Sequence, residues 1–186
     1  MLVSTPCPRA KSIDNRGAPL SRMIIAGIDP GTTRVGYAVI EDDRRVRQLL
    51  AIETITLPSL KTHGERLELI QRVLRERLLR DQVHGIALER VFFPKNTKTA
   101  IAVAEARGVI LLTAREHVRS IWEYTPSEIK LAVAGYGNAD KEGLRRMVRL
   151  LLPGTTLPSG GGSDDAIDAA AIALAACARE LKYYES

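Results

Sequence analysis

Three short apolar stretches lie close together near the start of the chain and have the length and composition of β-strands. They cover about residues 24–28, 35–40 and 46–56, and the turn sequence DPGTTR and the polar sequence EDDRR separate them. Connections this short join neighbouring antiparallel strands. The pattern therefore predicts a meander of three antiparallel strands.

The pattern then changes to helical spacing. Leu67, Ile70, Leu74 and Leu78 recur at intervals of three and four residues with charges between them, which predicts an amphipathic helix over about 65–79. Strands and helices alternate after it, and helices end the chain. In order, they are an apolar strand over 85–93, an alanine-rich helix over 97–114, a strand over 120–125, a helix that opens at Pro126 and breaks at Gly135, a helix from its cap Asp140 through Leu152, and a final helix from its cap Ser163 to about Tyr183. The order βββαβαβααα predicts the α/β class, with a mixed five-stranded sheet and helices on both of its faces.

The first 22 residues differ from the rest of the chain. They contain three prolines, little periodicity, and four basic residues against one acidic residue. We interpret residues 1–22 as a flexible basic extension and residues 23–186 as one domain. The extension carries +3 of the chain's net charge of +5, which leaves +2 for the domain. Binding to a polyanion would therefore depend on how the charges are arranged rather than on their number.

Composition also bears on where the protein works. The longest stretch without charge or strong polarity, Ala169–Ala178, has ten residues, whereas a membrane-spanning helix needs roughly 18. The first 22 residues lack the apolar segment of a secretory signal, and Cys7 and Cys177 form no metal-binding pair. We expect a cytoplasmic protein without a membrane span.

Four acidic residues occupy positions where a charged side chain needs a structural or functional explanation. Asp29 ends the first strand beside a Pro-Gly turn, a place that suits either a ligand-binding acid or a turn-forming aspartate. Glu89 lies in the most apolar strand, where it needs a bound cation or a salt bridge to a distant Arg or Lys. Asp165 and Asp168 are three residues apart at the start of the last helix, so their side chains share one face. The positive end of the helix dipole stabilises an acid in the first turn, which accounts for Asp165. It accounts less well for Asp168, which lies beyond the first turn.

If these four carboxylates meet, cations must offset their repulsion. Hard divalent ions prefer oxygen ligands, and two such ions about 4 Å apart can activate water and stabilise the leaving oxygen in phosphodiester hydrolysis. Zinc is disfavoured because His63, His84 and His117 are isolated in the sequence. The acids therefore indicate a metal-dependent phosphodiesterase.

The acids belong to a set of motifs that follow one another along the chain. The motifs are GIDPGTTRVGYAVI (27–40), ALERVFFPKN (87–96), EARG (105–108) and DDAIDAAAIA (164–173). In order and spacing, and over residues 23–181, the chain resembles the RuvC family of Holliday junction resolvases. The resemblance implies a ribonuclease-H-like fold and a metal-binding catalytic tetrad of Asp29, Glu89, Asp165 and Asp168.

The resemblance also implies an activity and partners. The expected activity is the nicking of two like-polarity strands across a four-way DNA junction, with 5′-phosphate ends and two Mg²⁺ or Mn²⁺ ions per site. The expected partners are a second copy of the chain, in a homodimer, and the branch-migration complex of RuvA and RuvB. Recombination and DNA repair are the implied setting.

Several expected DNA contacts follow from the same motifs. Phe92 matches an aromatic residue that wedges near the junction centre, and core packing is the alternative. Lys130 and Lys141 match basic positions near the scissile strand, although the sequence alone makes them helix-surface lysines. Further phosphate contacts are expected in or after the Phe92 loop, from Lys95, Asn96 and Arg107.

Three alternatives stay open from the sequence. The turn GIDPGTT is also similar to that of actin-, hexokinase- and Hsp70-like phosphotransferases, which need two such lobes where 186 residues supply one. A YqgF-like nuclease has a similar first motif but is usually shorter and lacks the ERVFF block. A junction-binding protein without catalysis is the third alternative, and the presence of all four acids argues against it.

Overall fold

The structure, a computed structural model, describes residues 22–43, 45–58, 62–90, 97–158 and 163–180. Its elements follow the predicted order βββαβαβααα. The strands are β1 (Met23–Asp29), β2 (Arg34–Asp42), β3 (Arg47–Thr56), β4 (Gly85–Glu89) and β5 (Ser120–Tyr124). The helices are α1 (His63–Arg80), α2 (Thr97–His117), α3 (Pro126–Ala134), α4 (Lys141–Leu151) and α5 (Ser163–Glu180). Of the predicted extension, only Arg22 falls within the described residues.

The five strands form one mixed sheet in the order β3-β2-β1-β4-β5. β2 pairs antiparallel with both β1 and β3, whereas β4 pairs parallel with both β1 and β5. The predicted meander and the mixed sheet are therefore confirmed. Since β1, β4 and β5 run in one direction, their carboxyl ends meet at the same edge of the sheet.

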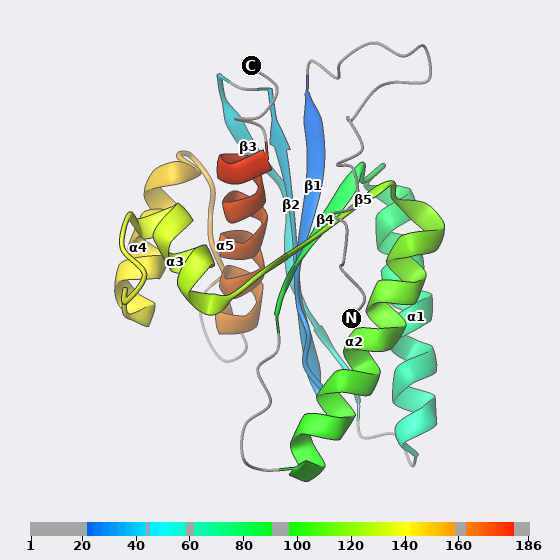
Figure 1. The fold of residues 1–186 in the computed structure, drawn as a ribbon. Coiled ribbons are helices and arrows are strands. Elements are labelled where there is room, and N and C mark those ends of the chain that lie inside the picture. Colours follow the sequence, from blue (N-terminus) through cyan, green and yellow to red (C-terminus); the bar gives the residue numbers. More distant parts are fainter. Residues whose placement is uncertain (1–21, 44, 59–61, 91–96, 159–162, 181–186) are drawn as a thin grey trace, which may run out of the picture.

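Helices cover both faces of this sheet, as predicted (Figure 1). On one face α1 and α2 enclose a core that includes Ile28, Ile70 and Ile110. On the other face α5 packs on β1 and β2, and α3 and α4 pack against α5. No helix in the described ranges is both long and apolar enough to cross a membrane.

The central helix α5 lies unusually close to the sheet. A Cβ atom on Gly27 of β1 would lie 2.0 Å from the carbonyl oxygen of Ala169, and one on Gly36 of β2 would lie 1.9 Å from that of Asp165. Only glycine allows the strand and helix backbones to approach this closely. The small side chains of α5 suit the same contact, and its residues from Ala169 to Cys177 are at most 2% exposed. The approach fixes the first turn of α5 against the ends of β1 and β2.

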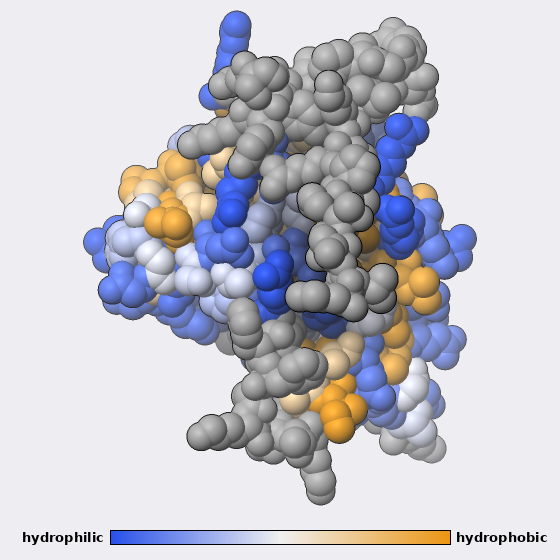
Figure 2. All heavy atoms as spheres, in the orientation of Figure 1, coloured by the Kyte–Doolittle hydropathy of each residue, from blue (hydrophilic) through white to orange (hydrophobic). Residues whose placement is uncertain are grey.

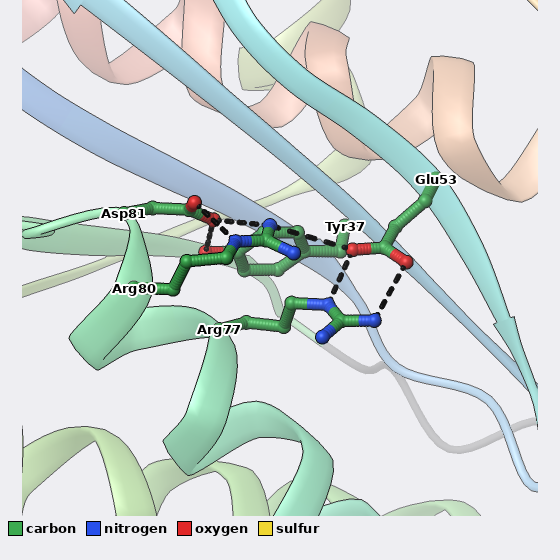
Figure 3. Close-up of polar contacts among 5 residues, drawn as sticks. All are labelled: Tyr37, Glu53, Arg77, Arg80 and Asp81. Carbon is green, nitrogen blue, oxygen red and sulfur yellow. Dashed lines mark hydrogen bonds and ion pairs between the residues drawn. The ribbon is translucent and has the colours of Figure 1, made fainter.

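A polar network ties the end of α1 to β2 and β3 on the opposite face (Figure 3). The buried Tyr37 hydroxyl donates to Asp81 at 3.0 Å, and Arg80 donates to both oxygens of Asp81 at 2.6 and 2.8 Å. Arg77 makes a second two-point contact, with Glu53, at 2.6 and 3.2 Å. Burial and the neighbouring Asp81 charge raise the pKa of Tyr37 above its usual range. The tyrosine therefore stays a hydrogen-bond donor at all ordinary pH values.

The observed boundaries differ from the predicted ones mainly in β4. The strand was expected over 85–93, but it ends at Glu89, and residues 91–96 lie outside the described residues. Its partner β5 ends at Tyr124 because Thr125 caps α3 and Pro126 begins that helix. The backbone N–H of Arg90 still donates to the Tyr124 carbonyl oxygen at 2.7 Å, although Arg90 itself lies beyond the end of β4. The ends of the other elements agree to within a few residues. The predicted end of the last helix, residues 181–183, also lies outside the described residues.

Candidate active site

The first pair of acids comes from the ends of two neighbouring parallel strands. Asp29 ends β1 and Glu89 ends β4, and the strands pair in register up to Ile28 opposite Leu88. Side chains alternate between the faces of a strand. Asp29 lies two residues after Gly27 and four after Ile25, and Glu89 lies two residues after Ala87. Ile25, Gly27 and Ala87 all face α5. Both carboxylates therefore lie on the α5 face at the same edge of the sheet.

The second pair comes from the start of α5. Gly36 lies opposite Asp29 in the β1–β2 register, and the carbonyl group of Asp165 lies directly over it. Asp168 follows one helical turn later and is largely buried. The structure thus brings the four acids expected from the sequence to one place.

Burial and mutual repulsion perturb three of these carboxylates. Burial, followed by repulsion from the other three acids, raises the pKa of Asp29 to about 7. Burial and then the charge of Asp168 raise the pKa of Glu89. Burial also raises the pKa of Asp168, with Asp165 and Asp164 adding to the rise and Lys141 opposing it. A site that holds excess negative charge in a partly buried position favours a bound cation.

Basic residues surround the acids without reaching all of them. The Nε atom of Arg34 lies 2.6 Å from Oδ2 of Asp165. Arg145 and Lys141 pair with the neighbouring Asp164, the lysine at 3.5 Å. The ion pairs of Arg34 and Arg145 were not foreseen from the sequence. Arg34 stands in the quoted turn motif, but only the strand register and the place of α5 show that it meets an acid 131 residues further on.

The residues expected to contact DNA fall into three groups. Lys130 of α3 and Lys141 of α4 lie on the acid side of the sheet, where their charges oppose the raised pKa values of Glu89 and Asp29. Arg107 of α2 lies on the other face and forms an ion pair with Glu123 of β5. The structure therefore does not bring Arg107 to the acids. Phe92, Lys95 and Asn96 lie outside the described residues.

The three histidines have partners away from the acids. His63 lies 2.7 Å from Glu105, and the Nδ1 atom of His84 accepts a hydrogen bond from the N–H of Ile24 at 3.0 Å. The Nδ1 atom of His117 lies 2.8 Å from a carbonyl oxygen of its own helix. None of these contacts involves Asp29, Glu89, Asp165 or Asp168.

The donor set fits a hard divalent cation. All four candidate ligands are carboxylates, and Mg²⁺ and Mn²⁺ favour oxygen ligands of this kind. Within the described ranges, no three Asp, Glu, His or Cys side chains stand in an arrangement that would ligate one ion, and Asp165 is engaged by Arg34. For the four carboxylates to hold an ion, their side chains would have to move together and Asp165 would have to release Arg34.

Sheet order, helix placement and the acidic edge together define an α/β protein of the ribonuclease-H-like fold. The family model described as crossover junction endodeoxyribonuclease RuvC matches residues 25–176. This chain belongs to the RuvC family. It is 44% identical over 152 residues to the RuvC of Moorella thermoacetica, a match that covers 82% of this chain and 89% of that protein. It is 41% identical over 152 residues to the RuvC of Alkaliphilus oremlandii, a match that covers 82% of this chain and 91% of that protein. It is also similar to a solved structure of Thermus thermophilus RuvC in complex with Holliday junction substrate, with a TM-score of 0.74, 30% identity, and coverage of 86% of this chain and 96% of that one.

Proposed function

We propose that this protein is an endonuclease that resolves four-way DNA junctions, acting with divalent cations held by Asp29, Glu89, Asp165 and Asp168. The observation that carries the proposal is the convergence of these four acids at one edge of the sheet, in a chain of the RuvC family. The names of its relatives, crossover junction endodeoxyribonucleases, supply the substrate class. Membership of this family favours the proposal over a phosphotransferase or a YqgF-like nuclease.

The carboxylates have a direct role in this activity. Mg²⁺ or Mn²⁺, two ions per site, would supply charge neutralisation, an activated water molecule and stabilisation of the leaving oxygen. Asp29 and Glu89, on strand ends, provide two rigid ligands, and Asp165 and Asp168 provide two more from one turn of α5. Repulsion among these carboxylates favours the binding of cations that neutralise them.

Positive side chains around the site are suited to the DNA backbone. Lys141 is 75% exposed although it lies near Asp164, so its ammonium group can also contact a phosphate. Lys130 stands near Glu89 in the same way. Phosphate contacts of this kind position the DNA without reading its sequence. Further DNA contacts are proposed from Phe92, Lys95 and Asn96, and from Arg107 in the middle of α2.

A homodimer would give the enzyme two sites for a symmetric substrate. Ile101 and Leu112 of α2 are 59% and 61% exposed, and Figure 2 shows apolar surface along the α2 side of the molecule. These residues are three helical turns apart and support α2 as the contact surface. Two related sites would make paired nicks in like-polarity strands and leave 5′-phosphate ends. We propose the cytoplasm as the setting and RuvA and RuvB as partners in recombination and repair.

Cleavage of a labelled mobile four-way junction tests the proposal. The same DNA sequence as a linear duplex serves as the substrate control, and each is incubated with Mg²⁺, Mn²⁺ or EDTA. Asp29→Asn should keep junction binding and lose cutting, whereas the matched exposed variant Asp43→Asn should cut like the parent protein. Junction binding without cutting under either metal would favour the non-catalytic alternative.

A further inference from the structure

Arg34 makes the one direct ion pair to the four proposed ligands among the described residues. It is the first residue of β2, and its side chain is 51% exposed while that of Asp165 is 24% exposed. Its position in β2 alternates with the buried Val35 and places it on the α5 face, like Gly36 and Ala38. The contact is therefore a consequence of strand register and of the close approach of α5.

Arg34 changes the electrostatics of the acidic edge unevenly. Asp29, Glu89 and Asp168 are each more than half buried and have raised pKa values. Asp165, in contrast, has the Arg34 guanidinium at hydrogen-bond distance. A guanidinium and a divalent cation both bind carboxylate oxygens. When both lie close to one carboxylate, they compete for its oxygens.

We propose that Arg34 competes with the divalent cation for the Asp165 carboxylate and thereby weakens metal binding at this site. The inference rests on the proposed function, in which Asp165 is a metal ligand. Removing the guanidinium should free Asp165 and remove one positive charge beside the cation. Because the pair is half exposed, we expect an increase in metal affinity of about fivefold.

Manganese binding in the absence of DNA tests this proposal. The signal of free Mn²⁺ in electron paramagnetic resonance falls as the ion binds, so a titration gives the dissociation constant without any measurement of cleavage. The variants are Arg34→Gln, which removes the charge, and Arg34→Lys, which keeps the charge but loses the guanidinium geometry. Arg22→Gln is the matched control, since Arg22 forms a similar half-exposed pair with Glu41 at 2.8 Å at the far end of β1.

The expected order of Mn²⁺ affinity is Arg34→Gln above Arg34→Lys above the parent, with Arg22→Gln equal to the parent. Thermal melts should show a larger Mn²⁺-induced rise in Tm for Arg34→Gln than for the parent. Equal or weaker Mn²⁺ binding by Arg34→Gln would overturn the inference. Asp29→Asn separates the two proposals: if the parent binds Mn²⁺ no better than Asp29→Asn, the proposed metal site itself fails.

Discussion

Gly36 is the position where a single methyl group should disturb the site most. A Cβ atom there would lie 1.9 Å from the Asp165 carbonyl oxygen and 3.1 Å from the Asp29 Cβ atom. Since side-chain carbons do not approach within 3.0 Å of such atoms, Gly36→Ala must push the first turn of α5 away from β2 by at least about 1 Å. Overpacking of this kind costs about 1–3 kcal/mol of folding free energy. A misplacement of about 1 Å at reacting groups costs about 100-fold in rate.

Junction cleavage rates and urea unfolding, measured on the same samples, check this prediction. Gly36→Ala should lose about 100-fold in the cleavage rate under saturating Mg²⁺ while it keeps enough stability to remain folded. Gly64→Ala in α1 is the control, because a Cβ there meets nothing within 4 Å and alanine favours a helix by up to about 1 kcal/mol. A Gly36→Ala protein that cuts at the parental rate would show that the glycine contact does not position Asp165 and Asp168.

Two further predictions concern stability. Asp29 has a pKa of about 7 in the folded protein against an ordinary value of 3.8, so the folded form holds a proton that the unfolded chain has released between these pH values. Stability in EDTA should therefore fall as pH rises from about 4 to 7, and Asp29→Asn should reduce that fall. If Tm changes with pH equally in both proteins from pH 5 to 8, this prediction is contradicted. Tyr37→Phe should lower the free energy of unfolding in urea by about 1 kcal/mol, because Asp81 loses a buried hydrogen-bond donor. It should leave junction cleavage unchanged, since Tyr37 faces away from the acids. A loss of cleavage without a loss of stability would contradict this and would show a link across the sheet.

Local patterns in the sequence were enough to predict most of the fold. The spacing of Leu67, Ile70, Leu74 and Leu78 predicted α1 because one face of that helix is buried. The strand–turn and cap signals predicted the order of the remaining elements. Local signals did not predict where β4 ends, because its length depends on its neighbour β5, which turns into α3 after Tyr124.

The candidate site was predictable to the extent that a carboxylate in an apolar setting is unusual. Glu89 and Asp168 stood out for that reason, whereas Asp29 stood out because it ends a strand beside a Pro-Gly turn. The structure brings all three together with Asp165. The pairing of Arg34 with Asp165 was not predictable, because the residues are 131 positions apart and meet only through the packing of α5 on β2. The same holds for Arg107, whose partner Glu123 lies on a strand that follows α2 and faces away from the acids.

The burial of α5 has a consequence for how the enzyme would lose activity on heating. The helix that carries Asp165 and Asp168 in its first turns is also the central element of one core, with Ala169 to Cys177 almost completely enclosed. A mobile loop can lose its shape while the rest of a protein stays folded, but this helix cannot leave its place without exposing that core. Heat inactivation and global unfolding of this enzyme would therefore share one midpoint, and changes that stabilise the core beneath α5 would extend its working temperature to the same degree.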